Sequence, residues 1–260
     1  MRALNAAKID RMFAKPFLAS LDGHLDSVEV ICRSRTLLAH ILTGGADCCI
    51  NFWDLPGKRS VVSVKKAHEG FVRGLAMSND SRVVYSVGSD KKQRAWRFCP
   101  DEFVINTEEE NVSDEDISEG GNLLKSIHWS SGFSSVDYHW SKPYEIATCC
   151  AHTVDLWVMF ASNSRIQSFE WGETSLLICK FNPSETNLLA ATMSDNSVGL
   201  FDTSASSGIQ KIFLKNKSNA ICWNPRDPFI FALANHDGNV YQMDMKRKGH
   251  LHHPINRTWI

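Results

Sequence analysis

The chain alternates short apolar stretches with clusters of turn-forming residues along most of its length. The first set of apolar stretches covers residues 28–31, 37–42 and 49–53, and turn residues separate its members. Apolar stretches of this length, bounded by turn residues, are typical of β-strands. Later units add an Asn-Pro turn after a strand, at 182–183 and 224–225. The pattern therefore predicts an all-β protein whose units contain a strand, a turn, a second strand, an aspartate turn, a third strand and an outer strand.

Two of these units share four side chains at matched spacing. Each set contains a histidine, a hydroxyl residue, an aspartate and a tryptophan, and the aspartate stands six residues before the tryptophan. The two sets are His24, Thr43, Asp47, Trp53 and His68, Ser86, Asp90, Trp96. The two aspartates are 43 residues apart. A period of this length is typical of repeat architectures such as propellers.

Three further copies of the repeat are weaker. Asp195 stands six residues before Phe201, Asp237 stands six residues before Met243, and the two aspartates are 42 residues apart. Another copy fits between Asp90 and Asp195 if Ala151 takes the aspartate position. The successive steps are then 43, 61, 44 and 42 residues. The second step is about 18 residues too long, so it should contain an insertion.

The repeat divides the chain into consecutive segments. A lead-in segment covers 1–20, the repeats cover 21–65, 66–127, 128–170, 171–215 and 216–248, and an irregular tail covers 249–260. The insertion is residues 100–121, after the Trp96 strand and before an outer strand near Leu123, and it contains nine acidic residues and no Lys or Arg. Such a composition predicts a disordered loop. Ser113 precedes three acidic residues in this loop, which makes it a candidate phosphorylation site.

The period, the Gly-His opening and the Trp-Asp ending together resemble the WD repeats of a β-propeller. Longer strings resemble the Sof family of WD-repeat ribosome-assembly factors, whose animal members are also called cullin-ring-ligase associated factor 13. These strings are 2–8, 13–17, 67–74, 181–183 and 221–225. The resemblance implies a propeller with about five recognisable blades of an expected seven. Since two blades, residues before Met1 and a basic helical tail of the family pattern are missing, we expect an incomplete ring.

The same resemblance implies a function. The Sof family belongs to the small-subunit processome, a nucleolar ribonucleoprotein of the nucleus that contains the U-three small nucleolar RNA. A member would be a non-enzymatic scaffold in 18S ribosomal RNA processing and ribosome biogenesis. It would need no cofactor, and its partners would be processome proteins, pre-ribosomal RNA and small nucleolar RNA, contacted directly or indirectly.

An alternative function is that of a substrate receptor of a cullin-ring ubiquitin ligase, bound to the ligase adaptor. Such receptors usually end a repeat with Asp-x-Arg. Here only the ending Asp244-Met245-Lys246 comes close, and lysine lacks the planar fork of arginine. The sequence therefore ranks this function second.

The histidine, hydroxyl and aspartate sets resemble catalytic triads. Because they recur with the repeat, and catalytic sites do not usually recur in each blade, we expect them to be structural and predict no catalytic residue. The two sets resemble the structural network of WD repeats, in which a buried hydrogen-bond chain runs from aspartate through histidine and hydroxyl to the indole N–H. His128 precedes the third-blade strand, but Ala147 and Ala151 stand at the positions of its partners. The fourth and fifth repeats keep their aspartates but have Ala191 and Leu233 at the hydroxyl position. Those blades should rely more on apolar packing.

Charge adds a candidate nucleic-acid surface. The net charge of −1 excludes a uniformly basic clamp but not local basic patches. Residues 58–97 contain ten Lys or Arg against three acids. Basic side chains provide sequence-independent affinity for phosphate, although a charge cluster is more often a solvated surface. The candidate RNA- or partner-contacting residues are Arg2, Lys8, Arg11, Lys15, Lys65, Lys66, Arg73, Lys91 and Lys92.

Other classes of site have little support. No run of about 18 apolar residues occurs, so no membrane span is expected. The eight cysteines include the adjacent pairs 48–49 and 149–150 and no Cys-x-x-Cys, which argues against a zinc ribbon or a disulfide framework. We therefore predict reduced thiols in an intracellular compartment and no metal site.

Overall fold

The computed structural model describes residues 19–98, 123–161, 165–205, 208–246 and 253–254. Several sequence predictions fall outside this part of the chain. They are the basic residues Arg2, Lys8, Arg11 and Lys15 of the lead-in segment, the acidic insertion 100–121 with Ser113, and all of the tail except 253–254.

The described residues form five four-stranded antiparallel sheets, each a simple up-and-down meander. Blade one contains β1 (Val28–Arg33), β2 (His40–Gly45), β3 (Ile50–Asp54) and β4 (Arg59–Val64). Blade two contains β5 (Val72–Met77), β6 (Val83–Gly88), β7 (Lys92–Arg97) and β8 (Leu123–His128). Blade three contains β9 (Phe133–Tyr138), β10 (Glu145–Cys150), β11 (Thr153–Val158) and β12 (Arg165–Glu170).

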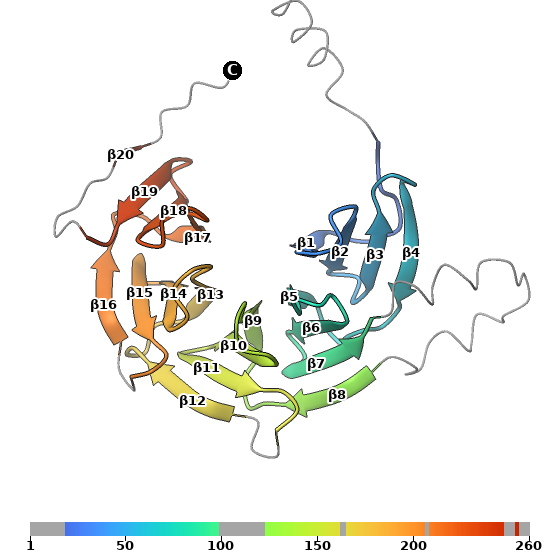
Figure 1. Ribbon diagram of the computed structural model, residues 1–260, viewed down its shortest axis with the longest axis horizontal. Coiled ribbons are helices and arrows are strands. Elements are labelled where there is room, and N and C mark those ends of the chain that lie inside the picture. Colours follow the sequence, from blue (N-terminus) through green and yellow to red (C-terminus); the bar gives the residue numbers. More distant parts are fainter. Residues whose placement is uncertain (1–18, 99–122, 162–164, 206–207, 247–252, 255–260) are drawn as a thin grey trace, which may run out of the picture.

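Blade four contains β13 (Leu176–Phe181), β14 (Leu188–Met193), β15 (Ser197–Asp202) and β16 (Gly208–Phe213). Blade five contains β17 (Ser218–Trp223), β18 (Ile230–Asn235), β19 (Val240–Asp244) and the short β20 (His253–Pro254). The first strand of each sheet lies nearest the centre and the sheets fan out around it, as Figure 1 shows. The predicted all-β propeller is confirmed. Its ring is open between blade one and blade five (Figure 1).

Two irregularities repeat with the blades. The inner strand of each blade skips one residue of the ladder with its neighbour near the start of the strand, as between Val28 and Val30 in β1. In blades one to four the outer strand contains a second bulge beside the tryptophan position, next to Trp53, Trp96, Trp157 and Phe201. Bulges bend a strand and increase its twist, so they help each short sheet to twist as a propeller blade does.

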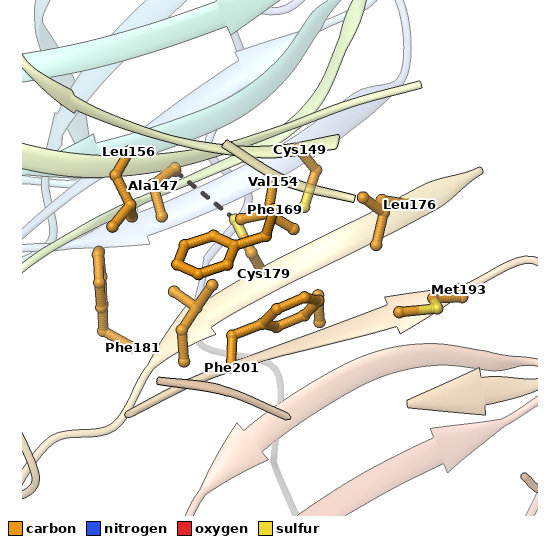
Figure 2. Packing of buried hydrophobic residues seen from close by; sticks show 12 residues of the cluster. Ala147, Cys149, Val154, Leu156, Phe169, Leu176, Cys179, Phe181, Met193 and Phe201 are labelled. Carbon is orange, nitrogen blue, oxygen red and sulfur yellow. Dashed lines mark hydrogen bonds between the residues drawn. The ribbon is translucent and has the colours of Figure 1, made fainter. Parts of the chain in front are cut away.

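The core lies between the blades. Each of the four apolar clusters draws on two neighbouring sheets. In the cluster between blades three and four, Phe169 and Phe201 pack with ring centroids 5.4 Å apart, and Leu176 and Phe181 lie beside them (Figure 2). All six residues of β10 and of β14 are buried, because sheets cover them on both faces. In β18 only every second residue is buried, because no sheet covers the face of β18 that is turned away from blade four.

Hydrogen bonds also connect consecutive blades on one face of the arc. We call it the far face, and it carries the turns between the first and second strands of each blade. The bonds are Ser34 Oγ with Ser81 Oγ (2.6 Å), Asn79 Nδ2 to the Trp140 carbonyl, His139 Nε2 to the Thr186 carbonyl (2.6 Å) and Asn182 Nδ2 to the Pro228 carbonyl (2.7 Å). These contacts supplement apolar packing in setting the angle between neighbouring blades.

Candidate functional site

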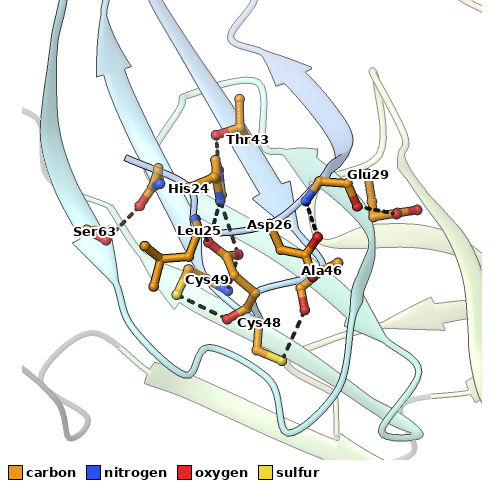
Figure 3. A network of polar contacts seen from close by, with 12 residues as sticks. His24, Leu25, Asp26, Glu29, Thr43, Ala46, Cys48, Cys49 and Ser63 are labelled. Atoms are coloured by element: carbon orange, nitrogen blue, oxygen red, sulfur yellow. Dashed lines mark hydrogen bonds and ion pairs between the residues drawn. The ribbon is translucent and has the colours of Figure 1, made fainter. Parts of the chain in front are cut away.

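The polar set of blade one meets on the face opposite to the far face, which we call the Asp face because it carries the aspartate turns. His24 Nδ1 lies 2.9 Å from Asp47 Oδ2, and His24 Nε2 lies 2.7 Å from Thr43 Oγ1 (Figure 3). Trp53 Nε1 donates to the same hydroxyl at 2.7 Å. Asp47 also accepts the backbone amides of Leu25 and Cys49, at 3.0 and 3.1 Å. The set therefore ties the loop before β1 to the β2–β3 turn.

The chain of donors fixes the protonation of the histidine. Trp53 can only donate, so the Thr43 oxygen accepts from it and the Thr43 hydroxyl proton is free to donate to His24 Nε2. Nε2 is then an acceptor, and the ring proton sits on Nδ1 and is donated to Asp47. A neutral imidazole of this tautomer satisfies each member of the chain. The Thr43 hydroxyl is buried and also accepts the Trp53 indole N–H, so it belongs to the interior of the blade.

Blade two repeats the arrangement. His68 Nδ1 lies 2.9 Å from Asp90 Oδ1, His68 Nε2 lies 2.8 Å from Ser86 Oγ, and Trp96 Nε1 donates to Ser86 Oγ at 2.8 Å. Burial alone would raise the pKa of Asp90, but the hydrogen bond from His68 and the backbone amides of Glu69 and Lys92 lower it to about 2. The pKa of Asp47 is lowered by the same kinds of bond against the same burial effect. Both carboxylates are held in the charged form.

Blade three corrects one prediction. The sequence comparison puts Ala147 at the hydroxyl position, but in the structure Trp157 Nε1 donates to Thr148 Oγ1 at 2.8 Å. The reason is the length of the β10–β11 hairpin. Cys150 pairs directly with Thr153 there, so the hydroxyl stands nine residues before the tryptophan instead of ten. The β10–β11 turn is thus one residue shorter than the aspartate turns of blades one and two, and Ala151 within it has φ of 34°.

The histidine position of blade three also changes. His24 and His68 stand four residues before the first residues of β1 and β5, and the matching residue before β9 is Trp129. The Trp129 ring meets Trp157 edge to face at 5.0 Å between centroids, and the Arg165 guanidinium lies 4.8 Å from the Trp129 centroid. Aromatic packing thus replaces the histidine–aspartate pair. The sequence carries no marker of the shorter hairpin that brings Thr148 into place, because Ala151 stands where the other repeats have the aspartate of the turn.

Blades four and five use different partners for their aspartates. Asp195 accepts the Ser197 hydroxyl and pairs with Lys211 Nζ at 2.8 Å. Asp237 accepts the Tyr241 hydroxyl at 2.6 Å. Ala191 and Leu233, at the predicted hydroxyl positions, are fully buried in apolar clusters.

The structure separates the basic residues of the second repeat onto two faces. Ile50 pairs with Val64 and Val72 with Gly88, so Lys65, Lys66, Arg73, Lys91 and Lys92 lie at the Asp-face ends of the strands. Asp54 pairs with Arg59 and Val83 with Arg97, which puts Arg59, Arg82 and Arg97 on the far face. The stretch that is uniformly basic in sequence is therefore not one patch in space.

Acidic neighbours hold two of the basic residues on the Asp face. Arg73 Nη1 lies 3.0 Å from Glu29 Oε2, and Lys92 Nζ lies 2.5 Å from Glu69 Oε1. Lys65, Lys66 and Lys91 are exposed, and Lys66 and Lys91 stand in tight turns with φ of 55° and 63°. We call Lys65, Lys66 and Lys91 the lysine group. Among the described contact residues predicted from the sequence, these three are exposed and lie outside the two ion pairs of Arg73 and Lys92.

The described residues offer little for metal or thiol chemistry. They contain no group of three or more His, Cys, Asp or Glu side chains close enough to hold a metal ion. Their cysteines are free thiols, and burial raises the pKa of the Cys149 thiol. No described helix is long and apolar enough to cross a membrane.

Comparison with known proteins agrees with this geometry. Residues 15–54 match the family model described as WD domain, G-beta repeat. DDB1- and CUL4-associated factor 13 of Danio rerio is 36% identical over 245 residues, which cover 94% of this chain and 51% of that protein. Protein SOF1 of Saccharomyces cerevisiae is 34% identical over 257 residues, with the same two coverages of 94% and 51%. The human DDB1- and CUL4-associated factor 13 is 37% identical over 223 residues, which cover 86% of this chain and 46% of that protein.

The fold and the blade network define a WD-repeat β-propeller protein, a class whose members generally act as scaffolds. Within this class the chain belongs to the family of protein SOF1 and DDB1- and CUL4-associated factor 13. It spans about half the length of the curated relatives that it matches.

Proposed function

We propose that the protein is a non-enzymatic scaffold in small-subunit ribosomal RNA processing, and that it acts in the nucleolus as part of the small-subunit processome. The observation that carries this proposal is the likeness of 94% of the chain to protein SOF1. The resemblance of the sequence to the Sof family supplies the processome role. The partners would be processome proteins, pre-ribosomal RNA and the U-three small nucleolar RNA.

The geometry supports a scaffold over an enzyme. Each hydroxyl of the two complete networks also accepts a tryptophan indole N–H, from Trp53 to Thr43 and from Trp96 to Ser86, which makes it part of the blade packing. His68 and Ser86 are buried, so a substrate has no access to them. These residues therefore stabilise blades one and two and are not available for general acid–base chemistry.

Affinity purification tests the proposal. A tagged chain expressed at its own locus should recover processome proteins and the U-three small nucleolar RNA from cell extract. Loss of that recovery after RNase treatment would assign the contact to RNA, and its persistence would assign it to proteins. Recovery of chaperones alone would refute the scaffold role for this chain.

The lysine group is the proposed RNA contact. Exposed lysines on one face bind phosphates by releasing counterions, so affinity should fall with salt. The triple variant Lys65→Glu, Lys66→Glu and Lys91→Glu should weaken binding to pre-ribosomal RNA at least about tenfold at low salt and reduce the salt dependence. The matched control reverses Arg59, Arg82 and Arg97, which lie on the far face of the same two blades. Equal losses in the two variants would contradict a contact specific to the Asp face.

A second candidate function is that of a cullin ligase substrate receptor, because the animal relatives are named for association with DDB1 and CUL4. In the ending that most resembles the receptor pattern, the Lys246 ammonium lies 3.9 Å from the centroid of the Phe229 ring, and the Lys246 amide donates to Asp244. Copurification of a cullin adaptor, without processome proteins, would favour this function. Lys246→Ala should then reduce recovery of the adaptor.

A further inference from the structure

The inner strands of all five blades surround a cavity of about 500 Å³ at the centre of the arc. The last residues of β1, β5, β9, β13 and β17 line it, so it lies toward the far face of the arc. Each strand contributes the same position of the repeat: Cys32, Ala76, Asp137, Lys180 and Cys222. This cavity takes no part in the blade networks, and the lysine group lies on the other face.

The cavity lining is cationic on balance. Asp137 is the only acidic residue among the described residues that line it, and Lys180, Arg33 and Arg35 are the basic ones. Asp137 Oδ1 accepts Lys180 Nζ at 2.8 Å, and Asp137 Oδ2 accepts the Phe181 amide at 2.8 Å. Burial alone would lower the pKa of Lys180, but Asp137 raises it, so this ion pair is charged and its two charges balance. The charges of the two arginines are then left uncompensated within the lining.

The arginines lie at the blade-one side of the cavity mouth, and both are exposed. Their neighbour Ile31 is 66% exposed. The wall therefore places two guanidinium groups beside an uncovered apolar side chain. Guanidinium groups pair with carboxylates in a two-pronged geometry, and the apolar surface gains by being covered.

The aromatic residues of the lining argue against a nucleic acid as the occupant. Tyr138, Phe181 and Trp223 are each at least nine-tenths buried, and Trp223 Nε1 is committed to the Lys180 carbonyl at 3.0 Å. Single-stranded RNA is usually held by bases that stack on exposed aromatic rings, and these rings are covered by their neighbours. A ligand with carboxylates next to an apolar side chain fits the wall formed by Arg33, Arg35 and Ile31 better than a nucleic acid does.

We propose that this cavity binds a short acidic peptide segment of a partner protein, in which Glu or Asp residues flank a large apolar residue. The carboxylates pair with Arg33 and Arg35, and the apolar side chain covers Ile31. The ion pair between Asp137 and Lys180 forms the floor and remains intact. This site is separate from the proposed RNA contact of the lysine group, which lies on the Asp face.

The experiment uses the whole 260-residue chain and a fluorescein-labelled peptide of alternating Glu and Leu residues, followed by fluorescence anisotropy. The protein should bind this peptide, and the same peptide with Gln in place of Glu should bind at least about tenfold more weakly. The double variant Arg33→Glu and Arg35→Glu should lose a similar factor, and Ile31→Ser should lose less. The control variant Arg82→Glu and Arg97→Glu, on the same face but outside the cavity, should bind as the wild type does.

Three outcomes would overturn the proposal. The first is equal binding of the Glu and Gln peptides, and the second is an unchanged affinity in the Arg33 and Arg35 variant. Displacement of the peptide by an oligouridine RNA at equal concentration would identify the cavity as an RNA site and would also refute it. All the substituted residues are exposed, and circular dichroism of each variant checks that the fold is retained. The lysine-group variant should bind the peptide normally, so failure of the RNA proposal and failure of this one are separable.

Discussion

At the scale of single residues, one hydroxyl oxygen holds each complete blade network together. Ser86 Oγ is bonded to both His68 and Trp96, and it is fully buried. A serine and a tryptophan ten residues apart, on neighbouring strands, can be found in the sequence alone. Their burial, and so the cost of losing the hydroxyl, comes from the neighbouring blade.

Replacement of Ser86 by Ala should lower the free energy of unfolding by about 1–3 kcal/mol, because it leaves the buried His68 imidazole nitrogen and the Trp96 indole N–H without a partner. Urea denaturation measures this. The control is Ser89→Ala in the same blade, where the side chain is exposed and the expected change is within about 0.5 kcal/mol. Similar losses in both variants would show that the hydroxyl bonds carry no specific stability.

Asp90 should make the stability of the protein depend on acid pH. Its pKa is about 2 in the folded chain: burial raises it, but the hydrogen bonds from His68 and from the backbone amides of Glu69 and Lys92 lower it further. In the unfolded chain the pKa of an aspartate is about 3.9. Because the folded value is the lower one, Asp90 stabilises the fold above about pH 4, and this contribution is lost as the pH falls toward 2. Asp90→Asn should therefore be less stable at pH 7 and lose less stability than the wild type between pH 5 and pH 2.

Urea unfolding at several pH values in this range measures the difference. The exposed Glu185→Gln variant is the control and should follow the wild-type decline. Parallel curves for Asp90→Asn and the wild type would show that Asp90 is not held by the network.

At the scale of strands and turns, the length of a hairpin decides which residue enters the network. The repeat predicts the third hydroxyl at Ala147 on the assumption that the aspartate turn always has the same length. The β10–β11 turn is shorter by one residue, so Thr148 takes the position instead. A strand presents alternate side chains to opposite faces, so a one-residue change reverses the roles of neighbours. Spacing alone could not reveal this, because the aspartate that marks the turn is absent.

The turn after the inner strand also connects blades. Asn182 is fully buried, donates to the Pro228 carbonyl in blade five, and accepts the amides of Ser184 and Glu185. Asn182→Ala should lower the free energy of unfolding by about 1–3 kcal/mol, because the Pro228 carbonyl and the Ser184 and Glu185 amides lose their partner. Asn224 takes the same place in blade five but is less buried, and within the described residues its side chain accepts the Arg226 amide alone, so Asn224→Ala should cost less than about 1 kcal/mol. Thermal or urea unfolding measures both variants. A larger loss for Asn224→Ala would contradict the connecting role of Asn182.

At the scale of the whole molecule, the position of a blade in the arc determines how well its strands are covered. Stability in repeat architectures is carried largely by contacts between neighbouring units. All of β14 is buried between blades three and five, whereas β18 has one open face. The sequence gives no sign of this difference, since both strands are apolar along most of their length.

Hydrogen exchange should therefore be uneven across the arc. Backbone amides of β18 should exchange at least about tenfold faster than those of β14, which corresponds to about 1.4 kcal/mol less protection. Mass spectrometry of proteolytic fragments measures the two strands in one experiment. Equal rates would show that the five blades unfold as one cooperative unit despite the open ring.

The sequence by itself determined the fold class, the repeat period and the two complete networks, because these depend on local alternation and on fixed spacing within one sheet. Tertiary structure alone decided three other things. It placed Thr148 instead of Ala147 at the hydroxyl position, because the length of the hairpin changes the face on which a residue lies. It divided the basic stretch 58–97 between two faces, because strands of a meander run in alternate directions. It also brought Arg33, Arg35, Asp137 and Lys180 to one cavity, because residues a full blade or more apart meet only when the inner strands converge on a common centre.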